Sequence, residues 1–217
     1  MEMNPLVFET SASTNSAIWA NAFFESAKVI TFFELCNTFD IFFLILQKNM
    51  VRIFLIGFMG CGKTATGRRL AQKIGWQWFD TDKFIEHRYR KNLTELFEEI
   101  GEEKYREIEH KILLEVAEFE NVVISCGGGL PCFDNNVEIM KNAGVTIYLQ
   151  ETPENLFERL KKAKVERILL KNKTETELKN YIFETLPKRE KFYRQADFTV
   201  KVSENFDHID EILREIT

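Results

Sequence analysis

The chain has 217 residues, 45% of them hydrophobic, and its 29 basic and 34 acidic side chains give a formal charge of −5. This is an ordinary globular composition with room for one buried core, and the acidic balance argues against a general nucleic-acid-binding surface. The four cysteines and three histidines lack the spacing of a zinc site, which indicates a reducing, cytoplasmic location without zinc.

The first 49 residues differ from the rest of the chain. They are rich in Ser, Thr, Asn and Phe, and the apolar run 29–46 is interrupted by Glu34, Asn37 and Asp40. An acid at the centre of a membrane span costs about 2.5–3.5 kcal/mol, and the basic start of a secretory signal is missing. We therefore expect no membrane anchor, a native start at Met50, and residues 1–49 to be a disordered or non-native extension.

From residue 50 to residue 217, strand-like runs alternate with helical ones. This alternation predicts one α/β domain, a five-stranded parallel sheet with helices on both faces. In residues 101–119 an apolar stripe recurs at helical spacing, with Glu and Lys on the other side. The charged segment 161–173 has the composition of a mobile lid or of a solvated loop. The strands are expected at residues 51–56, 76–79, 122–125, 145–149 and 198–202.

Residues 57–64 fit the phosphate-binding pattern G-x-x-x-x-G-K-[ST] and directly follow the first expected strand. Glycines allow the backbone N–H groups to turn toward phosphates, and the helix that follows adds the positive end of its dipole. Lys63 can reach the β and γ phosphates, and the Thr64 hydroxyl is placed for Mg²⁺. Cys61 is either a redox-sensitive thiol or simply a small residue. The predicted ATP contacts in this loop are Gly60, Cys61, Gly62, Lys63, Thr64 and Ala65.

Asp80-Thr81-Asp82 follows the second expected strand, at the sheet edge where open α/β folds bind ligands. Residues i and i+2 of a strand share a face, so one carboxylate could serve Mg²⁺ while the other accepts a proton from an attacking hydroxyl. A helix cap is the alternative, and it could explain Asp82 but not Asp80.

The turn Gly127-Gly128-Gly129 follows the third expected strand. It is either flexible or lets a ligand press against bare backbone N–H groups. These features and three arginines, in this order, resemble the shikimate kinase family, from about Val51 to the C-terminus. The matching positions are Asp80-Thr81-Asp82, Gly101-Glu102 with Tyr105-Arg106, residues 127–129, Arg167 with Leu169-Leu170, and Arg189 with Tyr193. Ile168 replaces the proline usual after the lid arginine.

The resemblance implies a P-loop kinase fold, similar to nucleoside-monophosphate kinases, with a mobile lid. The implied reaction is Mg²⁺-dependent transfer of the ATP γ-phosphate to the 3-hydroxyl of shikimate, in chorismate and aromatic amino-acid biosynthesis, by a monomer. It implies that Asp82 orients or deprotonates that hydroxyl and that Asp80 and Thr64 serve the metal. Shikimate would contact Asp82, Arg106, Gly127, Gly128, Gly129 and Arg189, the two arginines holding its carboxylate. Catalysis would also use Lys63 and Arg167, which closes from the lid, and ATP would further contact Arg159, Arg167 and Ser203.

Three alternatives remain beside this interpretation. Gluconate kinase or another small-molecule kinase of the same fold would need no arginine pair. A GTPase-like switch would need Asn-Lys-x-Asp, whose nearest match, residues 172–175, ends in Glu. A non-catalytic nucleotide-binding relative is disfavoured because the lysine, both aspartates and all three arginines are present. The residues alone indicate a magnesium-dependent phosphotransferase with a small anionic, hydroxylated acceptor.

Overall fold

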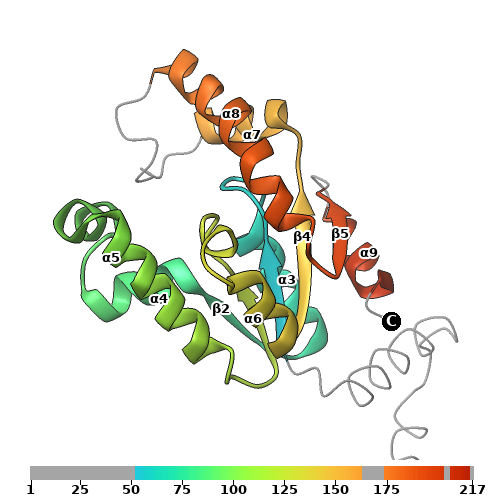
Figure 1. Cartoon of the computed structure of the whole chain (residues 1–217). Helices are drawn as coiled ribbons and strands as arrows, with labels where there is room; N and C mark the ends of the chain where they lie inside the picture. Colours follow the sequence, from blue (N-terminus) through green and yellow to red (C-terminus); the bar gives the residue numbers. More distant parts are fainter. Residues whose placement is uncertain (1–51, 163–173, 203–205, 216–217) are drawn as a thin grey trace, which may run out of the picture. The chain divides into compact units, whose positions relative to one another are not determined.

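The computed structural model describes residues 52–162, 174–202 and 206–215 (Figure 1). Several sequence-based expectations therefore lie outside the described residues. These are the extension 1–49, most of the expected lid, Arg167, Ile168 and Ser203.

The described chain contains a five-stranded sheet of order β2-β3-β1-β4-β5 in which every neighbouring pair is parallel. The predicted architecture is thus confirmed. The three inner strands are almost continuous runs of buried residues, as expected for a sheet covered on both faces. The strands are β1 (Arg52–Ile56), β2 (Gln77–Asp80), β3 (Val122–Ser125), β4 (Val145–Gln150) and β5 (Phe198–Lys201).

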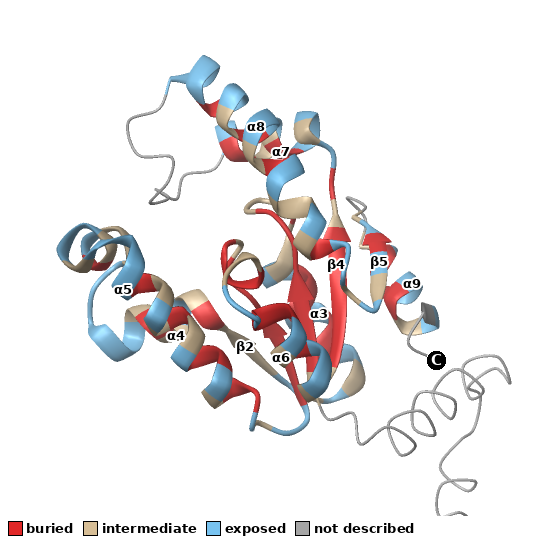
Figure 2. Ribbon diagram, viewed as in Figure 1, coloured by how far each residue is buried: buried red, intermediate tan, exposed pale blue. Residues whose placement is uncertain are grey.

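Helices connect the strands and cover both faces of the sheet (Figure 1). Helix α3 packs on β2 and β3 and contacts α9, whereas α6 packs on β4 and contacts α5. Buried residues are concentrated in the sheet and on the sides of these helices that face it (Figure 2). The helices are α3 (Lys63–Ile74), α4 (Thr81–Tyr89), α5 (Leu93–Val116), η1 (Leu130–Cys132), α6 (Asn136–Ala143), α7 (Pro153–Lys162), α8 (Glu175–Tyr193) and α9 (His208–Glu215).

Local signals explain where the long helices begin and bend. The α5 helix starts with a capping box in which Asn92 and Glu95 bond to each other's backbone N–H groups, and Thr174 and Glu177 start α8 in the same way. Gly101 has a φ of 79° and breaks α5 into two helical segments. The expected helix over residues 101–119 is therefore the second segment of a longer element.

Helices α7 and α8 pack against each other and project beyond the carboxyl ends of the strands (Figure 1). We call this helix pair the arm. Residues 161 and 162, the first two of the expected lid, form the end of α7. Within the described ranges, every helix is too short or too polar to span a bilayer.

Candidate active site

The phosphate-binding loop, residues 57–64, joins β1 to α3 at the carboxyl edge of the sheet. The φ angles of Gly57, Gly60 and Gly62 are 141°, 85° and 100°, values that side chains with a Cβ rarely adopt. The Lys63 ammonium donates hydrogen bonds to the carbonyls of Gly57 and Phe58, both at 2.9 Å. The lysine is thereby held over the loop, beside the N-terminus of α3, where an anionic phosphate is favoured.

This loop packs against the protein core through Cys61 and against the arm through Leu160. Cys61 is fully buried, and a Cβ on Gly57 would approach its sulfur to 3.0 Å. That burial favours the interpretation of Cys61 as a small core residue. From the arm, Leu160 of α7 covers the loop so closely that a Cβ on Gly60 would lie 3.1 Å from its side chain.

The Asp80 carboxylate ends β2 and makes contacts on both of its oxygens. One oxygen accepts the Thr64 hydroxyl at 2.8 Å, and the other accepts the N–H groups of Asp82 and Lys83 at 3.1 and 3.2 Å. Asp80 is therefore the N-cap of α4, and Asp82 lies in the first helical turn. The expectation that both carboxylates share a strand face is wrong, and the alternative of a helix cap applies to Asp80 and not to Asp82. Capping satisfies helix N–H groups that have no intrahelical acceptor.

The pair formed by Thr64 and Asp80 has the right chemistry for a magnesium ion. Both side chains offer oxygen, and Mg²⁺ is usually held by one or two carboxylates together with water and substrate phosphates. The described residues contain no cluster of three or more His, Cys, Asp or Glu that could hold a metal. A site here therefore fits an ion that draws its remaining ligands from solvent and ATP.

The triple-glycine turn leaves room for two charged side chains. A Cβ on Gly127 would lie 2.6 Å from a carboxylate oxygen of Asp82, and one on Gly129 would lie 2.6 Å from Nη1 of Arg106. The Gly127 N–H donates to the Thr81 hydroxyl at 2.8 Å. The glycines are thus required for close approach, which the interpretation of a merely flexible turn does not explain.

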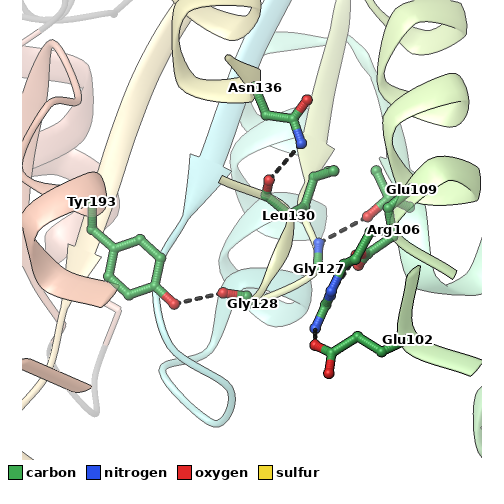
Figure 3. A network of polar contacts seen from close by, with 9 residues as sticks. Glu102, Arg106, Glu109, Gly127, Gly128, Leu130, Asn136 and Tyr193 are labelled. Carbon is green, nitrogen blue, oxygen red and sulfur yellow. Dashed lines mark hydrogen bonds and ion pairs between the residues drawn. The ribbon is translucent and has the colours of Figure 1, made fainter. Parts of the chain in front are cut away.

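Arg106 is held by two acids on its own helix, as Figure 3 shows. Its guanidinium donates to Glu109 at 2.5 Å and to Glu102 at 3.2 Å, and it stacks 4.1 Å from the ring of Phe133. Nε of Arg106 is buried without a hydrogen-bond partner among the described residues. These contacts hold the arginine beside the glycine turn.

Glu109 is a residue of the site that the sequence analysis missed. Its side chain is only 5% exposed, and burial raises the pKa of its carboxyl to about 7 despite the opposing charge of Arg106. The nearby Asp82 charge adds to that increase. The signal was its spacing, because Glu109 lies four residues after Tyr105 and three before Ile112, inside the buried stripe.

The buried carboxyl of Glu109 predicts a pH dependence of stability. Its native pKa, about 7, lies above the ordinary value of 4.5, so the native state binds the proton more tightly than the unfolded state does. The stability of the natural chain relative to Glu109→Gln should therefore fall as pH rises from about 4.5 to about 7. The pKa difference corresponds to a total of about 3 kcal/mol. Urea unfolding of both proteins across this range measures the difference. A difference that grows with pH would mean that Arg106 lowers the pKa of Glu109.

Two further arginines were expected at the site. Arg189 of α8 has its Nη1 buried without a hydrogen-bond partner in the described part of the chain, and its guanidinium carbon lies 5.5 Å from the centre of the Phe58 ring. Arg159 of α7 instead forms an ion pair with the buried Glu151 at 2.9 Å. Arg189 thus has one guanidinium nitrogen available to an anion, whereas Arg159 is engaged at the base of the arm.

One cavity of about 700 Å³ unites most of these groups. Of the expected site residues that the structure describes, Cys61, Gly127 and Arg159 do not line it. An apolar wall from Met59, Leu93 and Phe97 was not anticipated. The expected residues that do line the cavity are Gly60, Gly62, Lys63, Thr64, Ala65, Asp80, Asp82, Arg106, Gly128, Gly129 and Arg189.

Comparison with known proteins identifies the family of the chain. The family model described as shikimate kinase matches residues 59–217. The chain belongs to the shikimate kinase family. A shikimate kinase of Azobacteroides pseudotrichonymphae is 48% identical over 170 residues, which are 77% of this chain and 100% of that relative. A shikimate kinase of Bacteroides thetaiotaomicron is 48% identical over 71% of this chain and 89% of the relative.

Solved structures of shikimate kinases have the same fold. The crystal structure from Bacteroides thetaiotaomicron has a TM-score of 0.72 at 45% identity and covers 77% of this chain and 96% of its own. The Acinetobacter baumannii shikimate kinase, solved in complex with shikimate, has a TM-score of 0.69 at 28% identity and covers 80% and 94%. The chain is therefore an ATP-dependent kinase, of the family that phosphorylates shikimate on the route to chorismate and the aromatic amino acids.

Proposed function

We propose that the chain transfers the γ-phosphate of Mg²⁺-bound ATP to the 3-hydroxyl of shikimate within the 700 Å³ cavity. One observation carries the proposal. The glycine turn that receives Asp82 and Arg106 also lies against the phosphate-binding loop, since a Cβ on Gly128 would lie 3.2 Å from the Met59 nitrogen. The groups suited to an anionic acceptor and those suited to ATP phosphates therefore meet at one turn.

At the phosphate end of the cavity, Lys63 pairs with the β and γ phosphates and the loop N–H groups hold them. Thr64 and Asp80 would hold Mg²⁺, and the bound ion would supply neutralisation of the phosphate charge. The hydrogen bond between these two side chains already brings their oxygens to 2.8 Å. This pairing supports a shared role in metal binding.

At the acceptor end, Asp82 orients the 3-hydroxyl and accepts its proton. Arg106 and Arg189 bind the shikimate carboxylate, since a guanidinium matches a carboxylate bidentately. They come from α5 and α8, so they hold the ring between two elements and align it for attack. The shikimate bound in the Acinetobacter baumannii relative supports this acceptor.

The remaining assignments rest on the family resemblance. Arg167 would act on the transferring phosphate, and Arg159 and Ser203 would contact the nucleotide. For Arg159 this requires that the ion pair with Glu151 opens or leaves part of the guanidinium available. The monomeric state and the boundary at residue 50 stay predictions.

A coupled ADP-release assay tests the proposed function. The full chain and the fragment 50–217 would each be given ATP with shikimate, with gluconate or with no acceptor, with and without Mg²⁺. We expect ADP release only with shikimate and Mg²⁺, from both proteins. Equal release with gluconate or without any acceptor would contradict the assigned acceptor. Full activity in a chelator that removes Mg²⁺ would contradict the metal assignment.

A further inference from the structure

Tyr193 links the last turn of α8 to the triple-glycine turn. Its hydroxyl donates a hydrogen bond to the carbonyl of Gly128 at 2.6 Å, across 65 positions of sequence (Figure 3). Burial raises the pKa of Tyr193 well above its ordinary value. The hydroxyl therefore keeps its proton and remains a donor throughout the range in which an enzyme works.

The tyrosine ring is fixed by its surroundings. Tyr193 is fully buried, and its ring centre lies 5.3 Å from that of Tyr148, which is also buried. Because both rings are immobilised by packing, the direction of the Tyr193 hydroxyl is determined by the core.

The bond to Gly128 fixes one peptide group of the glycine turn. On its other side, Gly128 faces the Met59 nitrogen and the Gly57 carbonyl of the phosphate-binding loop. The carbonyl of Gly128 and the N–H of Gly129 belong to the same planar peptide, so holding the first also orients the second. Neither Gly128 N–H nor Gly129 N–H donates to an acceptor among the described residues, and both glycines line the cavity.

Tyr193 also lies on the same side of α8 as Arg189, one helical turn later. The intervening stretch follows Pro187, which cannot donate the helical hydrogen bond to the carbonyl of Phe183. The last turn of α8 keeps its own backbone hydrogen bond, from the Arg194 N–H to the Glu190 carbonyl, and side-chain contacts add to its placement. Among them, the Tyr193 hydroxyl bonds directly to the turn that faces the cavity.

We propose that Tyr193 is a positioning residue, which sets the place of Arg189 relative to the glycine turn and thereby the grip on shikimate. Its side chain is buried and does not line the cavity. The proposal rests on the role given to Arg189 under the proposed function. It assigns a role to Tyr193, which matches the family pattern but had no role in the interpretation above.

The test is Tyr193→Phe in the full chain, which removes the hydroxyl and keeps the ring. We expect KM for shikimate to rise about five- to ten-fold, the effect of one lost hydrogen bond, with KM for ATP changed less than about two-fold. The dissociation constant of shikimate, measured by calorimetry without ATP, should rise by the same factor. Tyr148→Phe is the matched control because its hydroxyl faces Glu190 and makes no bond to the turn. That control should leave both KM values unchanged.

A double variant separates positioning from general stability. If Tyr193 acts through Arg189, adding Tyr193→Phe to Arg189→Ala should raise KM for shikimate by less than the product of the two single effects. Independent multiplication of the effects would overturn the proposal. So would a Tyr193→Phe enzyme that melts earlier but binds shikimate normally. An unchanged KM in Arg189→Ala alone would instead contradict the role of Arg189 itself.

Discussion

Replacing Asp82 by asparagine is expected to lower kcat for shikimate phosphorylation by about 10²- to 10⁴-fold, the usual contribution of a positioned acid or base. Asparagine keeps the size of the side chain beside Gly127 and can still bond to a hydroxyl, but it cannot accept the proton. KM for shikimate should therefore change much less than kcat. Steady-state kinetics at saturating ATP measure both constants.

The control for this variant is Asp210→Asn on α9. Asp210 pairs with Lys73 at the surface, so its replacement changes the same charge without reaching the cavity. It should leave kcat unaltered. A parallel rise of KM for ATP in Asp82→Asn would show that Asp82 serves the nucleotide, and the assignment as a base would then fail.

Arg106→Ala is expected to raise KM for shikimate by about 10²-fold, because it removes a charge-assisted, partly buried contact to the carboxylate. KM for ATP should stay nearly constant. The change also removes the charge partner of the buried Glu109 carboxyl, whose pKa should then rise further, so some stability should be lost at neutral pH. Unfolding measurements should accompany the kinetics.

Two further variants separate binding from stability for Arg106. Arg106→Ala combined with Glu109→Gln should recover part of the lost stability but not the affinity for shikimate. Arg88→Ala removes an arginine that bonds to Glu115 by two 2.6 Å contacts at the exposed surface. It should change neither KM for shikimate nor KM for ATP. Recovery of shikimate affinity in the double variant would mean that Arg106 acts only by neutralising Glu109.

The sequence predicts the sheet well because its strands are short runs of apolar residues between turn residues. The expected bounds of β3 are those of the structure, and those of β4 and β5 differ by one residue. The β2 strand differs by one residue at both ends, and this small shift decides which aspartate caps α4. A pattern of residue types does not fix such a boundary, since the identity of the N-cap depends on the residue at which the strand ends.

The same reasoning explains why Glu109 escaped notice. A glutamate within a helix is usually exposed, so its residue type does not indicate that Glu109 is buried beside the apolar stripe. The pairing with Arg106 is local, three residues apart on α5. The burial of Glu109, however, depends on the glycine turn after β3 being brought against α5, a contact between segments far apart in sequence. By contrast, the loop residues 57–64 and the glycine turn were found because their chemistry depends on local backbone.

The contact between Leu160 and Gly60 gives the arm a direct hold on the nucleotide loop. Leu160 packs over Gly60, so an outward swing of α7 would expose this part of the loop further to solvent. The exchange of the Gly60 amide with solvent deuterium would consequently report the arm's movement, even though the amide belongs to a different element. The conformation of the loop and the position of the arm are in this way coupled through a single van der Waals contact.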